Sequence, residues 1–431
     1  MDTPKAHSIW RDADFVRLWS AGTISIFGSL VGRTAVPFVA ILVLGAGPAE
    51  VAGLRSLELA AALVVGLLAG AWVDRLRRRP VMIAADLGRA VLLGSIPVAA
   101  VLGVLSLAQL GVVILCWAML TTVFDLADRA FLPTLVGGDR LVEANSALTA
   151  GSAAAEFSGF GISGFLVQLL GAPMTVAVDA ASFVASAVLV GFIRRPEPPA
   201  PPAAERAPVL REVREGLDIV ARSAVLRALA AATALTHLTY GVFGAIWILY
   251  VNKELGLSPA AIGLIAAVGG LSSLGGALLV GPVARRAGVG RTLVIGAAGF
   301  LLGQLALPLA PSGAPLVAGA WLVLAQLVGD GAATAYEILD MSTRQGCVDD
   351  RRLGRVNGTI GTTATLLELA GTVVAGLVGE ALGLRPAVWL GLTGAALALL
   401  VVWFSPLRAM REPPARPLGP AVVGEEMPIT E

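Results

Sequence analysis

The chain has 431 residues, of which 56% are hydrophobic and only 14% are charged. Its mean hydropathy of +0.82 lies far outside the range of soluble domains, so the composition predicts a membrane protein embedded in the lipid bilayer. The formal net charge of +1 gives no support for a nucleic-acid partner. The two cysteines, Cys116 and Cys347, fall in or beside predicted helices, so we expect no disulfide framework and no metal site.

Long apolar segments, separated by charged or Pro/Gly-rich stretches, predict twelve membrane-spanning helices. Because lipid offers the backbone no hydrogen-bond partner, such segments must be helical. The expected spans, in chain order, are 15–43, 50–74, 80–105, 109–131, 143–169, 172–193, 224–251, 258–283, 290–310, 314–338, 353–380 and 386–406. We therefore expect an all-α membrane protein with a six-helix bundle in residues 1–193 and another in 224–406.

A polar segment, residues 194–223, separates the two groups of helices. Its first half is a proline-rich linker, and its second half, VLREVREGLDIV, has an arginine-bearing face that is typical of an amphipathic helix on a membrane surface. A plain solvated loop is the alternative. Residues 407–431 are polar and rich in proline, which predicts a disordered tail.

The arginines are unevenly distributed among the connections between helices. The connections on one side hold little more than Lys253 and Arg385. The alternate connections hold Arg75, Arg77, Arg78, Arg79, Arg140, Arg194, Arg195, Arg285, Arg286, Arg291, Arg344, Arg351, Arg352 and Arg355. Because basic residues accumulate in short cytoplasmic loops, we expect both termini and the central linker to be cytoplasmic.

The second half of the chain repeats the first at an offset of 212 residues. Asn145 aligns with Asn357 and Glu156 with Glu368, although the chain has only three asparagines. Asp125 and Asp128 align in the same way with Glu337 and Asp340. Two pseudo-symmetric halves are the arrangement in which an alternating-access transporter holds its substrate between repeats. Chance repetition in an Ala/Gly/Leu-rich chain is the alternative.

Four segments resemble one known family. They are GAWVDRLRRRPVMIAADLGRA (70–90), DRAFLPTLVGGDRLVEANSAL (128–148), VDAASFVASAVL (178–189) and STRQGCVDDRRLGRVNG (342–358). The chain resembles the major facilitator superfamily, in the branch of bacterial macrolide efflux and enterobactin export proteins. The resemblance implies the bacterial inner membrane as location. There are departures, because Arg285 replaces the acid in the second copy of the loop motif and no acid lies near Ser29 in the first helix.

Ionisable side chains within the membrane are costly, so each is a candidate for function. At about 1.5 Å per residue, Glu156 and Glu368 lie about 16 Å from the cytoplasmic helix ends, which is near the midplane. We expect them to take up protons or to meet cationic substrates, or else only to stabilise helix packing. Arg33 and Glu58 both fall about 24 Å from the cytoplasmic face, so they could form an ion pair, with Arg55 as a competitor.

The resemblance also implies two further groups of residues. Asp330, His237 and Tyr240 fall on helices that line the central cavity in relatives, whereas Asp179 falls on a peripheral helix and is expected to be structural. A second group is expected to hold the halves together on the cytoplasmic side when the cavity opens outward, with Asp74 facing the start of the helix over 353–380. This gate comprises Asp74, Arg75, Arg79, Asp86, Arg89, Asp125, Asp128 and Arg129.

Other chemistries find no support in the sequence. The chain has no GxxxxGK phosphate-binding loop, and its two histidines are too far apart for a zinc helix motif, so we expect neither an enzyme nor a cofactor. We therefore expect a monomeric, proton-coupled exporter of hydrophobic or amphipathic small molecules. The export direction comes from the resemblance alone. The alternatives are an uptake symporter for a nutrient and a membrane receptor or scaffold that kept the fold without transport.

Overall fold

The computed structural model describes residues 8–73, 76–137, 140–197 and 209–412. Within these ranges it contains twelve long helices in two groups of six, which we call the N-half and the C-half. The N-half consists of α1 (Ala13–Phe38), α2 (Pro48–Val73), α3 (Arg78–Val101), α4 (Leu107–Val136), α5 (Leu141–Leu170) and α6 (Ala172–Gly191). The C-half consists of α8 (Ala224–Lys253), α9 (Pro259–Ala287), α10 (Val289–Leu309), α11 (Pro315–Cys347), α12 (Asp350–Leu382) and α13 (Leu384–Phe404).

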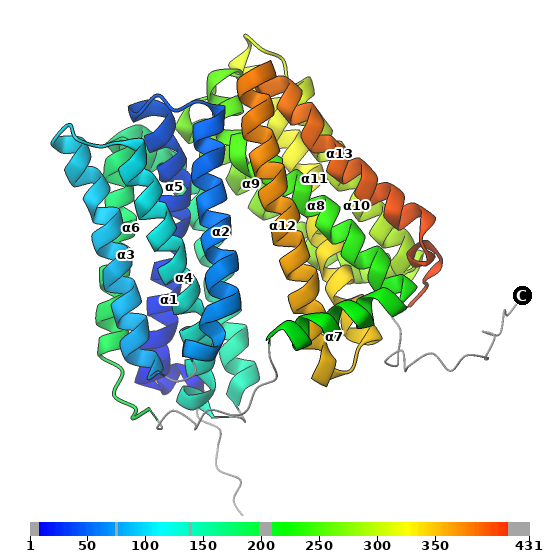
Figure 1. Ribbon diagram of the computed structural model, residues 1–431, viewed down its shortest axis with the longest axis horizontal. Coiled ribbons are helices and arrows are strands. Elements are labelled where there is room, and N and C mark those ends of the chain that lie inside the picture. The colour runs from blue at the N-terminus through cyan, green and yellow to red at the C-terminus, as the bar shows by residue number, and fades with distance from the viewer. Residues whose placement is uncertain (1–7, 74–75, 138–139, 198–208, 413–431) are drawn as a thin grey trace, which may run out of the picture.

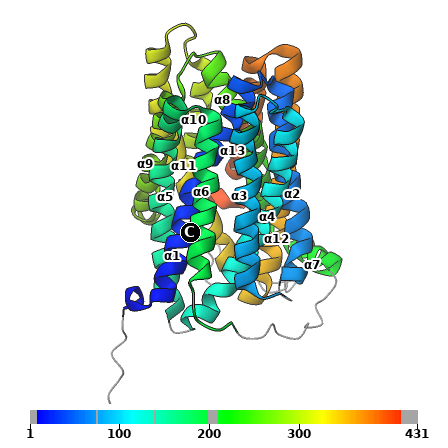
Figure 2. The ribbon, with the colours of Figure 1, turned by 90° about the vertical axis from the view of Figure 1, so that its left-hand side faces the viewer.

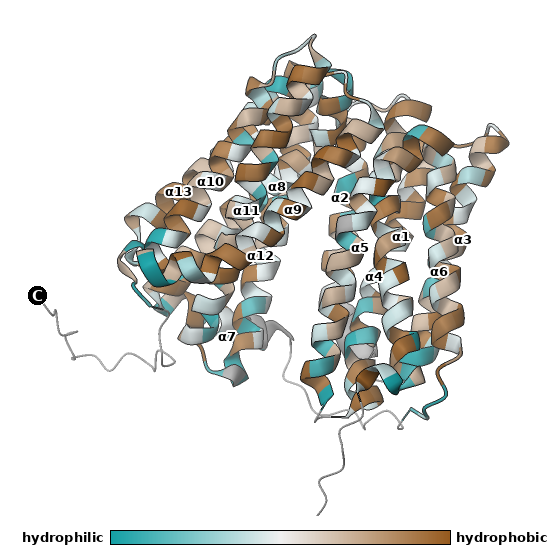
Figure 3. Cartoon of the chain, turned by 180° about the vertical axis from the view of Figure 1, so that it is seen from behind, coloured by the Kyte–Doolittle hydropathy of each residue, from teal (hydrophilic) through white to brown (hydrophobic). Residues whose placement is uncertain are grey.

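The long helices have the composition of membrane spans. Within the described residues, eleven of them, all but α2, are both long enough and apolar enough to cross a bilayer. Hydrophobic residues dominate the length of the helices, and hydrophilic residues gather toward one end of the molecule (Figure 3). The expected all-α membrane architecture with two six-helix halves is therefore confirmed.

Local sequence signals set the helix ends. The Ser223 and Ser258 hydroxyls each accept a hydrogen bond, 3.3 Å long, from a backbone amide in the first turn of α8 and α9. Gly171 and Gly383, which align in the repeat, follow α5 and α12 with φ angles of +80° and +96°. Because these angles favour glycine, the repeat preserves two helix ends as well as polar positions.

The halves meet on one side of the molecule. We call the side that carries the first turn of α1, the end of α13 and helix α7 (Val209–Arg222) the linker side, and the opposite side the far side (Figure 1). Near the far side, a Cβ added at Gly164 of α5 would lie 2.9 Å from the Gly263 nitrogen of α9, and one added at Gly376 of α12 would lie 2.6 Å from the Ala52 Cβ of α2. Small residues thus allow the halves to pack closely there, whereas α2 and α12 diverge toward the linker side (Figure 1).

Helix α7 (Val209–Arg222) lies across the linker-side end of the C-half (Figures 1 and 2). Glu215 forms a 2.6 Å ion pair with Arg355 of α12, and Gly216 packs against the Arg355 backbone and Thr359. This stretch is therefore not the plain loop that we considered as the alternative. Its position on a membrane surface stays a prediction.

Two expected boundaries were wrong. Helix α11 ends at Cys347, not near residue 338, because Asp340 and Arg344 form an ion pair one turn apart within it, and Arg344 donates a 2.7 Å hydrogen bond to Thr233 of α8. The segment from residue 407 is ordered as far as residue 412, and includes the 3-10 helix η4 (Pro406–Ala409). It is held there because the Gly290 amide at the start of α10 donates to the Met410 carbonyl at 2.8 Å.

Candidate functional site

A chain of five ionisable side chains runs through the interior and crosses from one half to the other. Arg33 of α1 pairs with Glu58 of α2 at 3.0 Å, and Arg55 of α2 pairs with the other oxygen of Glu58 at 2.6 Å. Arg55 also pairs with Glu368 of α12 at 2.9 Å, and the second Glu368 oxygen lies 3.0 Å from His237 Nδ1 of α8. We call these residues the interhalf network. The two predicted pairings of Glu58 are therefore not competitors, because its two oxygens bind both arginines.

Helix geometry and one glycine place these groups together. Arg55 and Glu58 lie three residues apart on α2, so they share one face of that helix. A Cβ added at Gly241 of α8 would lie only 2.0 Å from the Glu368 carbonyl oxygen. The glycine therefore allows α8 and α12 to approach closely at the level where His237 meets Glu368.

The two carboxylates of the network are balanced by two arginines and are largely removed from solvent. The Glu58 and Glu368 side chains are 17% and 13% exposed. Two arginines offset two carboxylates, and a buried carboxylate left without its cation would be strongly destabilising. A proton that arrives on Glu368 or His237 therefore changes both the net charge and the strength of the contact between the halves.

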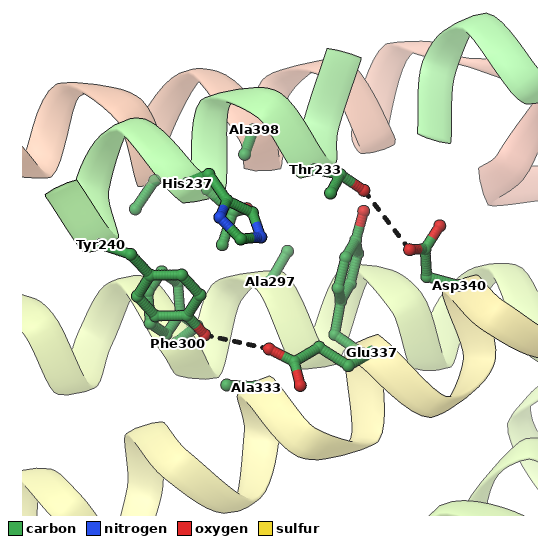
Figure 4. A pocket seen from close by; sticks show the side chains of 12 residues that line it. Thr233, His237, Tyr240, Ala297, Phe300, Ala333, Glu337, Asp340 and Ala398 are labelled. Atoms are coloured by element: carbon green, nitrogen blue, oxygen red, sulfur yellow. Dashed lines mark hydrogen bonds between the residues drawn. The ribbon is translucent and has the colours of Figure 1, made fainter. Parts of the chain in front are cut away.

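A pocket within the C-half adjoins the network at His237 (Figure 4). The Tyr240 hydroxyl donates to Glu337 at 3.1 Å, and the Tyr240 ring packs edge to face on His237 and on Phe300, with centroids 5.5 and 5.3 Å apart. Glu337 is exposed to the pocket. Aromatic rings and a free carboxylate oxygen together can accommodate an apolar molecule that carries a positive charge.

A second cavity lies on the far-side portion of the helices, lined mostly by the N-half and completed by Gly244 and Ile248 of α8. Its wall includes Arg33, Arg55, Glu58, Trp117 of α4 and Asp179 of α6. Three buried atoms here, Asp179 Oδ2, Trp117 Nε1 and Arg55 Nε, have no hydrogen-bond partner among the described residues. We call this space the N-half cavity. Asp179, expected to be a structural residue on a peripheral helix, is fully buried and borders this cavity.

Glu156 is placed differently from Glu368, its repeat equivalent. It is exposed on α5 and takes part in no ion pair of the described residues. The same helix face carries Asn145, Thr149 and Ala153 toward the linker side and Phe160 toward the far side, and these residues line two open pockets. Glu156 therefore stands on a stripe that borders open space, whereas Glu368 is enclosed.

The predicted gate residues lie within the N-half in this conformation. Asp86 and Arg89 form the expected pair on α3, fully buried, with the Arg89 guanidinium 4.3 and 4.1 Å from the ring centroids of Phe124 and Phe183. This pair contacts helices of its own half, so it does not join the halves here. Asp74 and Arg75 lie outside the described residues.

The remaining gate residues lie near the linker side. Asp125 and Arg129 are exposed and Asp128 is half-buried on α4. Arg79 Nε donates to the Val190 carbonyl of α6 at 3.1 Å. The start of α3 is capped by Glu197, whose carboxylate accepts a 2.6 Å hydrogen bond from the Arg78 amide. The contact expected between Asp74 and the start of α12 lies outside the described residues.

Asp330 was expected on the central cavity, and this placement was wrong. Its carboxylate packs between α11 and α9, where a Cβ added at Gly269 would lie 2.1 Å from Oδ2. Gln326, one turn earlier on α11, also packs against Gly269, and its Nε2 lies 2.8 Å from the same added Cβ. The residue of α11 that reaches the pocket is Glu337, two turns further along. Its alignment with Asp125 in the repeat was the signal that could have identified it.

Two similar six-helix bundles with ionisable side chains between them are the architecture of an alternating-access membrane transporter. The model of the Major Facilitator Superfamily matches residues 18–336 and 229–430, and the chain belongs to this superfamily of transporters. It is 30% identical over 356 residues to the multidrug efflux pump Tap of Mycolicibacterium fortuitum, covering 79% of this chain and 83% of that one. It is 26% identical over 378 residues to the uncharacterised transporter YfiS of Bacillus subtilis strain 168, covering 85% and 87%.

Among solved structures, the fold is similar to a bacterial homologue of the iron transporter ferroportin. The inward-facing state of that protein gives a TM-score of 0.74 at 18% identity, covering 92% of this chain and 99% of that one. Its outward-facing state gives 0.57 at the same 18% identity, with 90% and 98% covered. The arrangement of the two halves is therefore more similar to the inward-facing state.

Proposed function

We propose that this transporter exports hydrophobic or amphipathic small molecules in exchange for protons. The observation that carries the proposal is the interhalf network, in which Arg55 of the N-half binds Glu368 of the C-half at 2.9 Å. A contact of this kind holds the far side closed while Glu368 is ionised. Protonation of Glu368 removes the charge that Arg55 binds, and so favours separation of the halves on that side.

The linker side is the cytoplasmic side in this proposal, since the arginine-rich connections lie there. The conformation described above is then open to the cytoplasm and ready to receive substrate. The higher similarity to an inward-facing neighbour than to its outward-facing state supports this orientation. After substrate release outside, Glu368 takes up a proton, and it returns that proton to the cytoplasm when the Arg55 contact forms again.

The substrate binds within the C-half beside His237, in the pocket of Tyr240, Phe300 and Glu337, next to the interhalf network. Rings at right angles supply apolar contact area, and the Glu337 carboxylate attracts a cationic group. The similarity to a multidrug efflux pump supports a substrate of this class. Glu156, on the opposite half, gives a second carboxylate that borders open space.

The test is a susceptibility profile in an efflux-deficient bacterial host, comparing the wild type with Glu58→Gln, Glu156→Gln and Glu368→Gln. Asp218→Asn is the matched control, since Asp218 is 64% exposed on α7 and pairs only with the neighbouring Arg222 among the described residues. We expect the wild type and the control to raise resistance to cationic amphipathic compounds, and Glu368→Gln to abolish this effect. Undiminished export by all three carboxylate variants would refute the proton-site assignment.

Two other outcomes would replace the proposal. An uptake symporter would accumulate one compound saturably inside the cell and leave drug susceptibility unchanged. A receptor or scaffold would show no substrate-dependent proton movement in liposomes across a broad panel of compounds.

A further inference from the structure

Asp179 is a fully buried carboxyl group that the interhalf network does not use. Its exposed fraction is 0%, and it lies on α6 against α1. A Cβ added at Gly32 of α1 would lie 2.0 Å from Asp179 Oδ2, and one added at Gly28 would lie 2.9 Å from Oδ1. The two glycines, four residues apart on one helix face, therefore form a slot that receives this carboxyl group.

The carboxyl group has few compensating partners. Oδ1 is 3.4 Å from the Ser182 hydroxyl, and Oδ2 has no hydrogen-bond partner among the described residues. An ionised carboxylate in this setting would be an uncompensated buried charge, and proteins avoid this by keeping the group neutral. Close packing of α1 on α6 requires only a small residue at position 179. Packing therefore does not explain why an acid stands there.

The charged groups on the neighbouring elements are occupied elsewhere. On α3, Arg89 is bound by Asp86, and on α2, Arg55 is shared by Glu58 and Glu368. Arg33, which follows Gly32 on α1, is bound to Glu58, and Glu156 of α5 lies on the open stripe. The five-residue turn after α1, η2 (Val39–Val43), which also contacts α6, carries no ionisable side chain.

The N-half cavity connects Asp179 to the interhalf network. Asp179 and Glu58 border it from α6 and α2, and Arg33 of α1 is also part of the cavity wall. The partnerless Trp117 Nε1 faces the same space. Polar side chains on four helices therefore border one cavity, in which Arg33 is bound to Glu58 and Asp179 has no cation.

We propose that Asp179 is a second proton-binding site of the transporter, which holds its proton in this conformation and exchanges it through the N-half cavity. In the exchange, the O–H bond of the Asp179 carboxyl breaks and the proton passes to the Glu58 carboxylate. Arg33, released from the neutral Glu58, then binds the Asp179 carboxylate, so the total charge is unchanged. This inference rests on the proposed proton-coupled function.

The first experiment measures the proton itself. Infrared spectra of the full chain in lipid nanodiscs, recorded in H₂O and D₂O, detect the carbonyl band of a protonated carboxylic acid. We expect a band that Asp179→Asn removes and that Ser182→Ala shifts, because the Ser182 hydroxyl is 3.4 Å from Oδ1. A spectrum in which neither variant changes any such band would overturn the proposal. Should Asp179→Asn fail to fold, the Ser182→Ala shift alone decides.

The second experiment separates a transport role from a packing role, with ethidium as the probe in proteoliposomes. Asn keeps the shape of the neutral acid but carries no exchangeable carboxyl proton. We therefore expect Asp179→Asn to keep ethidium movement down its own gradient and to lose at least about tenfold in movement driven by a pH gradient, a barrier change of about 1.4 kcal/mol. Asp218→Asn on α7, whose side chain is 64% exposed, is the control and should keep both activities.

Equal pH-driven movement by the wild type and Asp179→Asn would overturn the transport role. Wild-type vesicles in which a pH gradient drives no ethidium movement would instead contradict the proposed function. In that case the infrared band still decides whether Asp179 holds a proton, so the two failures are distinguishable.

Discussion

Glu156 and Glu368 occupy equivalent positions in the two halves, yet only Glu368 belongs to the interhalf network. The partners of Glu368 are Arg55 of α2 and His237 of α8. At the repeat offset of 212 residues, the corresponding positions around Glu156 are Ala267 of α9 and Ser25 of α1. The repeat thus preserved both carboxylates while only one of them kept cationic neighbours. A repeated residue in a pseudo-symmetric transporter therefore has a function that depends on the partners opposite it.

The largest loss of transport is expected from Glu368→Gln, and comparing it with Glu156→Gln tests whether the two carboxylates differ in function. Neutral glutamine leaves Arg55 without half of its charge compensation and removes the proton-binding group. We expect proton-driven transport in proteoliposomes to fall by about a hundredfold or more, since breaking a buried pair costs about 3–5 kcal/mol. Glu156→Gln should lower transport by less than about tenfold. Equal losses in both variants would show that the two carboxylates act alike.

A smaller but measurable loss of thermal stability is expected from a substitution at Gly241, where α8 packs against α12 beside the network. Gly241→Ala places a Cβ 2.0 Å from the Glu368 carbonyl oxygen and pushes α8 away from α12. Overpacking of this kind costs about 1–3 kcal/mol, which a thermal unfolding measurement in detergent can detect. Gly361→Ala on α12, where an added Cβ meets nothing within 4 Å, is the control and should be neutral or stabilising. A destabilised control with an unaffected Gly241→Ala would contradict this packing account.

The contact between the halves can be weakened from the side of the N-half. Arg55→Gln removes the only described cation that joins Glu58 to Glu368. We expect spin labels at positions 145 and 351, on the linker-side ends of α5 and α12, to gain a population at shorter separation as the far side opens more often. Arg55→Lys keeps the charge and should change the distribution less. An unchanged distance distribution in Arg55→Gln would mean that the far side is closed by glycine packing alone.

The smallest effect is expected in the pocket of the C-half. Tyr240→Phe removes the hydroxyl that donates to Glu337 at 3.1 Å and keeps the ring between His237 and Phe300. A single hydrogen bond of this kind contributes about 0.5–1.5 kcal/mol, so we expect apparent substrate affinity to change by about two- to tenfold. The concentration dependence of transport measures this change. A total loss of transport would indicate that Tyr240 does more than orient Glu337.

Hydropathy and the repeat were sufficient to predict the fold, because lipid forces each apolar segment into a helix of nearly fixed length. Helical rise also placed Arg33 and Glu58 at one depth, and the structure joins them at 3.0 Å. Partners from the opposite half were not predictable, since depth alone does not give the rotation of a helix about its axis. For this reason the pairing of Arg55 with Glu368 was missed and Asp330 was misplaced.

The segments that leave the two halves both turn back onto a helix of their own half. After α6, the Glu197 carboxylate binds the first amide of α3, and after α13, the carbonyls of Met410 and Arg411 bind the first amides of α10. In each half, the segment that follows the last helix is thus hydrogen-bonded to the start of another helix of the same half. Rotation of one bundle against the other then requires no unwinding at the bundle ends, and the work of the cycle is confined to the contacts between the bundles.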